Sequence, residues 1–140
     1  MIVLDTNVVS ELMRPAPDAG VLAWIRAQDA GDLYTTSVTL AEVRYGIERL
    51  PDGRRKTLLR RTADEVFGGF EEQVLPFDAR AALRYATIVF GRDRIGRPID
   101  GFDAQVASIC REQQAALATR NVTDFEHTEV EVIDPWSAAN

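Results

Sequence analysis

The chain has 140 residues, 46% of them hydrophobic, and a formal net charge of −6 at pH 7. This length suits one compact domain over residues 1–140 that buries roughly two thirds of its unfolded surface. The acidic balance argues against a protein that holds nucleic acid by bulk charge and leaves room for a local basic site. No apolar run is long enough to span a bilayer and none forms a signal peptide, so we expect a cytoplasmic protein without a membrane contact.

The first predicted element is a short buried strand over residues 2–4, because continuous apolar runs with β-branched residues are typical of parallel sheets. Asp5, Thr6 and Asn7 follow it, and residues 8–13 continue as a helix. Asp5 therefore has two interpretations. It caps this helix by accepting hydrogen bonds from free backbone N–H groups. Alternatively, it lies just past the carboxyl end of a strand, where open α/β sheets bind ligands.

Helices and short strands alternate along the rest of the chain, as apolar spacing and turn residues indicate. The predicted helices cover residues 21–28, 38–50, 56–67, 78–92 and 102–114. The predicted strands cover residues 32–37, 73–77, 116–118 and 130–133. This alternation predicts an α/β domain with a mostly parallel sheet of four or five strands wrapped by helices.

Two further acids lie near predicted helix starts. Glu42 fits a capping box with Thr39, in which Thr is followed three positions later by Glu. Asp103 lies on the shoulder of an apolar helix face, where acids rarely occur without a partner. Asp100 as N-cap, with Asp103 in the first helical turn, explains the same pattern equally well.

Asp124 follows a predicted strand across a polar turn, much as Asp5 follows the first strand. The sequence thus offers Asp5, Glu42, Asp103 and Asp124 from four separate elements. Gathered together, these carboxylates repel one another unless a cation or a proton intervenes. Ligands that are all oxygen indicate Mg²⁺ or Mn²⁺, whereas one cysteine and one histidine cannot form a zinc site.

Local cations for nucleic acid occur in two clusters. Arg92, Arg94 and Arg97 lie in the loop predicted before Asp103, and this position favours a contact with RNA. The other cluster, in a helical region, comprises Arg54, Arg55, Lys56, Arg60 and Arg61. A solvated charged face is the alternative explanation for either cluster, since charge runs usually form one.

Four stretches of the chain carry a family resemblance: LDTNVVSEL, TSVTLAEVRYG, GRPIDGFDAQVASIC and ALATRNVTDFE. In order and spacing they resemble the PIN-domain ribonucleases, most closely the VapC and FitB-like toxins of bacterial toxin–antitoxin pairs. The resemblance covers nearly the whole chain and implies a PIN-like α/β/α sandwich, with acids at the carboxyl edge of the sheet that hold Mg²⁺ or Mn²⁺. Asp5, Glu42 and Asp103 match the three principal acids, and Asp124 matches the more variable fourth.

The resemblance also implies an activity. Thr6 and Asn7 match positions beside the first acid, and Thr119 and Asn121 lie in a stretch that lines the same pocket in relatives. The implied protein is a Mg²⁺-dependent endoribonuclease in which a metal-activated water attacks an RNA phosphodiester bond. It is a toxin that works as a homodimer and is held inactive by a cognate antitoxin, which often joins a DNA-binding domain to a segment lying over the active site.

Three other functions compete with this one. A haloacid-dehalogenase-like phosphatase would use Asp5 as its nucleophile, but its pattern requires a second acid two positions on, where this chain has Asn7. A catalytically silent PIN-like module would act through a protein partner, although all four acids are present. A nuclease that cuts DNA is the third alternative, because a metal site recognises phosphate and not the sugar.

Overall fold

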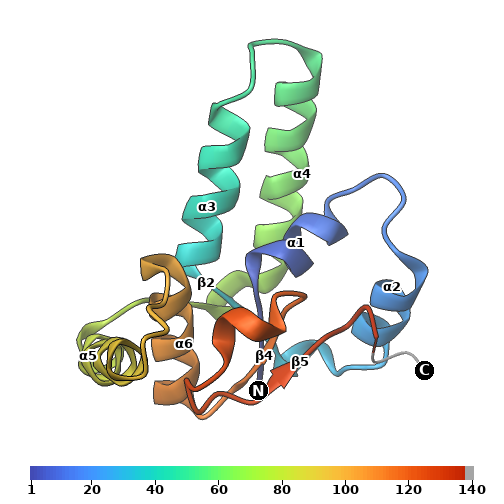
Figure 1. Cartoon of the computed structure of the whole chain (residues 1–140). Coiled ribbons are helices and arrows are strands. Elements are labelled where there is room, and N and C mark those ends of the chain that lie inside the picture. The colour runs from blue at the N-terminus through green and yellow to red at the C-terminus, as the bar shows by residue number, and fades with distance from the viewer. Residues whose placement is uncertain (138–140) are drawn as a thin grey trace.

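A five-stranded parallel sheet forms the centre of the molecule (Figure 1). The computed structural model describes residues 1–137. In spatial order the strands are β3 (Val74–Leu75), β2 (Leu33–Thr36), β1 (Ile2–Leu4), β4 (Ala116–Ala118) and β5 (Val132–Ile133). Every neighbouring pair is parallel. This confirms the predicted α/β fold and its mostly parallel sheet.

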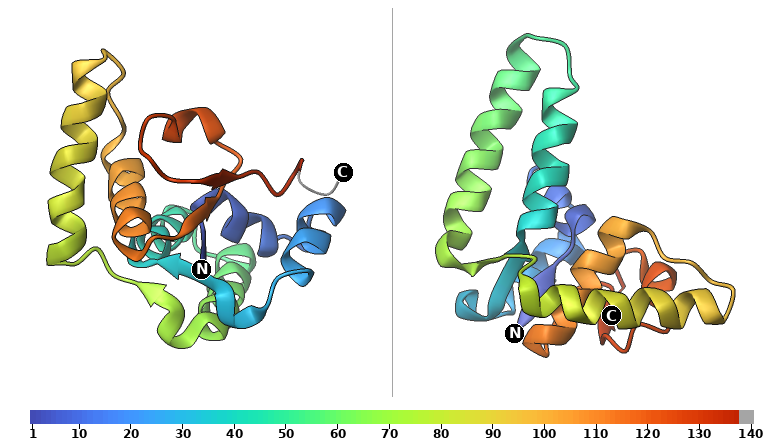
Figure 2. Two further views of the ribbon diagram at one scale, coloured as in Figure 1. Left: turned by 90° about the horizontal axis from the view of Figure 1, so that it is seen from below. Right: turned by 90° about the vertical axis from the view of Figure 1, so that its left-hand side faces the viewer.

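Six helices cover the sheet. They are α1 (Thr6–Leu12), α2 (Ala19–Arg26), α3 (Ser37–Glu48), α4 (Arg54–Phe70), α5 (Ala79–Arg94) and α6 (Gly101–Gln113). Short 3₁₀ turns η1, η2 and η3 span Ala30–Asp32, Glu71–Gln73 and Val122–Phe125. Figure 2 (left) shows α5 and α6 on one side of the sheet and α1 and α2 on the other.

Two apolar clusters lie on the two faces of the sheet, because successive strand residues point in opposite directions. Val3 and Leu117 join the cluster that includes residues of α5 and α6. Leu4 and Ala118, one position further along each strand, join the cluster that includes residues of α1, α3 and α4. The result is a three-layer arrangement of helices, sheet and helices.

The helices α3 and α4 form a hairpin that projects beyond the sheet (Figures 1 and 2). Lys56, only 7% exposed, closes this hairpin near its turn. Its ammonium donates to the Glu48 carbonyl at 2.9 Å and to the Asp52 carboxylate at 3.5 Å. Lys56 is therefore not part of a free basic surface for nucleic acid.

Most predicted elements are present, with shifted ends. The first helix begins at Thr6 rather than at residue 8 because Asp5 is its N-cap. The third strand has two residues instead of five, since Pro76 has no N–H to donate to a neighbouring strand. No helix within residues 1–137 is long and apolar enough to cross a membrane.

Candidate functional site

All five strands are parallel, so their carboxyl ends meet at one edge of the sheet, and the four predicted acids come from segments near it. Asp5 follows β1 directly, and Glu42 lies in the second turn of the helix after β2. Asp103 is in the first turn of α6, and Asp124 lies in η3 after β4. These acids interact electrostatically: burial first, then the charges of the other three acids and of Asp100, raise the pKa of Asp103 to about 7.

Asp5 is the most firmly held acid. Its side chain is buried and accepts from the Thr6 N–H at 2.9 Å through Oδ1. Its Oδ2 accepts from the Thr119 hydroxyl at 2.8 Å and from the Asn7 amide at 3.4 Å. Burial raises the pKa of Asp5, and the hydrogen bonds from Thr6 and Thr119 act in the opposite direction. The carboxylate is thus fixed in place at the end of β1.

A small network holds the residues around Asp5. Asn7 donates to the Thr119 hydroxyl at 2.9 Å and accepts from the Arg120 N–H at 3.0 Å. The Thr119 hydroxyl also accepts from the backbone N–H of Asn121 at 3.1 Å. Of the predicted supporting residues, Thr6, Asn7 and Thr119 use their side chains. Asn121 contributes its backbone.

Glu42 is held from α1 and not by its own helix. The Thr6 hydroxyl donates to Glu42 Oε1 at 2.9 Å. The predicted capping box is wrong, because α3 begins at Ser37 and its N-cap is Thr36, which accepts from the Thr39 N–H at 3.1 Å. Burial raises the pKa of Glu42, the Thr6 hydrogen bond lowers it, and the charges of nearby acids raise it.

Thr39 is a site neighbour that sequence reasoning missed. It is fully buried, and its hydroxyl lies 3.2 Å from the Thr6 hydroxyl. The sequence placed Thr39 only in a capping box, and no local pattern indicates a contact across 33 positions. Thr39 therefore belongs to the polar packing that supports Thr6 and, through Thr6, Glu42.

The carboxylates of the other two acids, Asp103 and Asp124, are not held by hydrogen bonds from residues 1–137. The Asp103 N–H donates to Asp100 at 3.4 Å, so Asp100 is the N-cap that the sequence suggested. Over residues 1–137 we find no hydrogen bond to the carboxylate of Asp103, and burial and repulsion alone shift its pKa. Asp124 is exposed, and its carboxylate likewise accepts no hydrogen bond from the described part of the chain.

The donor set fits a hard divalent cation, since all four candidate ligands are carboxylates. Burial is the largest cause of the raised pKa of Asp103, and such a cation would relieve the repulsion from neighbouring acids that adds to it. In the described conformation, however, no three His, Cys, Asp or Glu side chains of residues 1–137 lie close enough to hold one ion. The acids are neighbours, and binding an ion would require their side chains to turn toward it.

The structure buries one of the three arginines predicted to contact RNA. Arg92 and Arg94 lie in the last turn of α5, and only Arg97 is in the loop. Arg92 is buried and donates to backbone carbonyls, so it cannot reach a ligand in solvent. Arg94 is exposed over the Phe90 ring, and Arg97 pairs with Glu126 at 3.0 Å. Arg94 and Arg97 therefore stay candidates for contacts with RNA.

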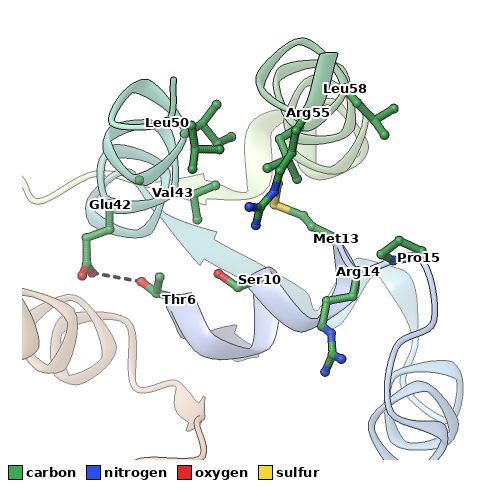
Figure 3. Close-up of a pocket in the computed structure, with 13 residues that line it drawn as sticks. Thr6, Ser10, Met13, Arg14, Pro15, Glu42, Val43, Leu50, Arg55 and Leu58 are labelled. Atoms are coloured by element: carbon green, nitrogen blue, oxygen red, sulfur yellow. Dashed lines mark hydrogen bonds between the residues drawn. The ribbon is translucent and has the colours of Figure 1, made fainter. Parts of the chain in front are cut away.

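A pocket of about 560 Å³ opens beside Glu42 between α1, α3 and α4. Figure 3 shows Thr6 and Glu42 at one end of it, with Arg55 of α4 directed toward Met13. Its lining includes the apolar side chains of Met13, Val43, Ile47, Leu50, Leu58 and Leu59. Of the four acids, Glu42 thus adjoins an apolar groove on the side of the helical hairpin.

Comparisons with known proteins agree with this geometry. The family model described as PIN domain matches residues 2–131. VapC ribonuclease Y4jK of Sinorhizobium fredii is 39% identical over 99% of this chain and all of its own length. Toxin FitB of Neisseria gonorrhoeae is 35% identical, over 97% of this chain and 99% of its own.

A solved structure repeats the fold. A chain in the structure of FitAB bound to IR36 DNA fragment aligns with a TM-score of 0.90 and 35% identity. The alignment covers 97% of this chain and 96% of that one. The agreement in fold and sequence extends over nearly the full length of both proteins. The chain belongs to the PIN domain family.

Proposed function

We propose that this protein is a Mg²⁺-dependent endoribonuclease and the toxin of a toxin–antitoxin pair. The observation that carries the proposal is the set of four carboxylates near one sheet edge, where burial first, and then the charges of the neighbouring acids, raise the pKa of Asp103 to about 7. A cluster of acids without a basic partner suits a divalent cation. The relatives named ribonuclease and toxin favour RNA cleavage over the other reactions such a site could support.

Asp5 and Asp103 are the expected principal ligands, with Glu42 and Asp124 beside them. When bound, Mg²⁺ or Mn²⁺ would supply positive charge to a phosphodiester and make a water more acidic. Thr119 and Asn7 hold the Asp5 carboxylate in one orientation. Thr6 engages one oxygen of Glu42 and leaves Oε2 available to an ion or a proton.

The substrate needs cations as well as a metal. Arg94 and Arg97 lie at the end of α5 and in the loop before α6, and they are our candidates for RNA phosphate contacts. The protein carries a net charge of −6, so such contacts have to be local. Of the alternatives, the phosphatase is not favoured because the position of its second acid holds Asn7, which donates to Thr119.

The partner we propose is an antitoxin that joins a DNA-binding domain to a segment covering the site. FitAB, the relative's two-component complex, is bound to DNA in its solved structure. On this chain, the apolar groove has Glu42 in its lining and suits an apolar segment. A basic side chain on that segment could pair with the carboxylates in place of the metal.

A homodimer is the expected assembly. Tyr45 on α3 is 64% exposed, Phe102 on α6 is 53% exposed, and both line a second hollow with Glu42. Exposed aromatic residues are typical of interfaces. We expect Tyr45→Ser to shift the protein toward the monomer in light scattering, whereas Leu58→Ser, at a similarly exposed position on α4, leaves the dimer intact. A monomeric wild type would contradict this.

The test is cleavage of a mixed pool of structured RNA and matched DNA by the purified, partner-free protein with Mg²⁺, Mn²⁺ or EDTA. We expect RNA to be cut with either metal, no cutting in EDTA, and loss of cutting in Asp103→Asn. Cutting that persists in EDTA would contradict the proposal, and preferential cutting of DNA would favour the alternative nuclease. Metal binding without any cleavage would favour the silent module.

A further inference from the structure

Arg92 is the one arginine that the sequence placed at the substrate and the structure buries. It is 5% exposed, in the last turn of α5. Its Nε donates to the Arg97 carbonyl at 2.6 Å. Its Nη1 donates to the carbonyls of Asp124 at 3.0 Å and Glu126 at 2.9 Å. In the described chain no carboxylate pairs with this guanidinium.

These three carbonyls belong to two different segments of the acid edge. Arg97 lies in the loop that leads to the N-cap of α6 and on to Asp103. The carbonyls of Asp124 and Glu126 lie at η3 and just beyond it. A second, outer link joins the same segments, because the Arg97 guanidinium pairs with the Glu126 carboxylate, and both side chains of that pair are nearly half exposed.

A buried cation without a carboxylate is unusual, since removing a charge from water is costly. Backbone carbonyls offset part of that cost, and the flat, forked guanidinium can reach several of them at once. The Asp124 carboxylate accepts no hydrogen bond from residues 1–137, so the position of its backbone alone limits where its side chain can reach. Arg92 holds that backbone by the carbonyl of Asp124 itself.

We propose that Arg92 is a positioning residue that sets the Asp124 carboxylate relative to Asp103 and thereby tunes the affinity of the site for a divalent cation. This inference rests on the proposed metal-dependent function. Arg92 touches neither ion nor RNA, and it acts through the backbone of η3. It is therefore the analogue of the hydrogen-bonding partners that orient metal ligands in other proteins.

The experiment measures Mn²⁺ binding without RNA, at pH 8, by electron paramagnetic resonance. Arg92→Lys keeps the charge and removes the fork, and we expect it to weaken Mn²⁺ binding about 10- to 100-fold, as removal of an orienting partner does. The matched control is Glu126→Gln, which removes the exposed outer link between the same segments. We expect that control to bind within about twofold of wild type, since exposed ion pairs contribute little.

A double-mutant cycle separates positioning from general destabilisation. In an Asp124→Asn background, we expect Arg92→Lys to weaken Mn²⁺ binding by less than about twofold, because its effect passes through Asp124. Amide exchange over residues 121–127 is expected to accelerate in Arg92→Lys, with the β1 amides unchanged. If circular dichroism shows that Arg92→Lys is unfolded, Arg92→Gln, which retains an amide donor, takes its place in the cycle.

The outcomes are distinct. If Arg92→Lys lowers the affinity for Mn²⁺ equally in the wild-type and Asp124→Asn backgrounds, or in neither, the proposed role of Arg92 is overturned. The proposed nuclease function still stands in that case, provided that the wild type cleaves RNA with metal. A wild type that binds no Mn²⁺ overturns this inference together with the metal-dependent function. A decrease confined to the background that retains Asp124 is the expected result.

Discussion

The two halves of the acid edge differ in how their carboxylates are held. Asp5 and Glu42 accept hydrogen bonds from Thr6 and Thr119, which fix their oxygens. Asp103 and Asp124 accept none within residues 1–137, and burial and repulsion raise the pKa of Asp103 to about 7. We name these the fixed pair and the free pair. The fixed pair keeps its geometry without an ion, whereas the free pair gains its geometry from one.

This difference explains why neighbouring acids do not yet form a ligand cage. Hydrogen bonds to a carboxylate stabilise its charged form, and they oppose the effect of burial at Asp5. Asp103 has no such compensation, so a proton or a cation has to supply it. A prearranged half and an adaptable half would let the protein fold without metal and bind one afterwards.

The largest expected effect comes from Asp5→Asn. The change removes one charge from the fixed pair but preserves shape, so we expect native circular dichroism. We expect RNA cleavage to fall by more than the roughly 100-fold that removal of an orienting partner costs, because Asp5 is a proposed ligand itself. Initial cleavage rates with Mg²⁺ measure the effect. Wild-type rates in this variant would contradict the assignment of Asp5.

A smaller effect is expected from Thr119→Val, which removes the hydroxyl that orients Asp5. We expect about 10- to 100-fold weaker Mn²⁺ binding, and the free energy of unfolding to fall by about 1–3 kcal/mol because buried polar partners become unsatisfied. The matched control is Thr35→Val, whose buried hydroxyl donates to the Leu4 carbonyl and to no acid. Urea unfolding and Mn²⁺ titration of both variants make the comparison. Equal Mn²⁺ affinities for the two variants would remove Thr119 from the site.

Asp103 makes stability depend on pH. The pKa of Asp103 is near 3.8 in an unfolded chain and about 7 in the fold, so between these values only the folded state holds the proton. Raising pH through this window therefore lowers the stability of the metal-free protein, and the decline is complete above pH 7. Melting in EDTA from pH 4 to 8 measures this decline.

A variant and an added metal ion make the melting experiment across pH more specific. Asp103→Asn removes the group that titrates, so we expect a shallower decline of melting temperature with pH. Mg²⁺ binds the ionised carboxylates, so its stabilising effect is expected to increase with pH. A metal-free protein whose stability rises steadily from pH 4 to 7 would contradict the raised pKa.

The smallest expected effect concerns the arginines beside the free pair. We expect the double variant Arg94→Ala, Arg97→Ala to bind RNA more weakly. The slope of log affinity against log salt concentration should fall in magnitude by about 0.7 for each RNA phosphate that an arginine no longer neutralises. Arg84→Ala is the matched control, because Arg84 lies elsewhere on α5 and pairs with Glu112. Binding of single-stranded RNA in Ca²⁺, measured over a salt series, reports the slope. An unchanged slope would remove both arginines from the substrate path.

The sequence predicted the elements and the location of the acids well, for local reasons. The apolar run before Asp5 indicated a buried strand, and parallel strands bring their carboxyl ends together. Asp100 as the N-cap of α6 also followed from neighbouring residues alone. These features depend on a few adjacent side chains, which a single sequence displays directly.

Long-range contacts were beyond the sequence. Glu42 fitted a capping box, yet its partner is Thr6, 36 positions earlier. Arg92 looked like a surface cation beside Arg94, yet its guanidinium bonds to carbonyls 32 and 34 positions later. In both cases local composition was compatible with two environments, and packing of distant segments decided between them. The free pair could not be recognised from the sequence either. It is defined by the absence of hydrogen bonds to its two carboxylates within residues 1–137, and a sequence does not display which contacts a side chain lacks.

The position at which a divalent ion binds tests the four-acid site most directly. Crystals of the partner-free protein grown with Mn²⁺ at pH 8 would give anomalous difference density at the ion. We predict a peak beside the acids, where Asp5 and Asp103 would hold the ion, with Asp5 still bonded to Thr119. A peak elsewhere, or no peak in crystals of protein that cleaves RNA with Mn²⁺, would contradict the four-acid site.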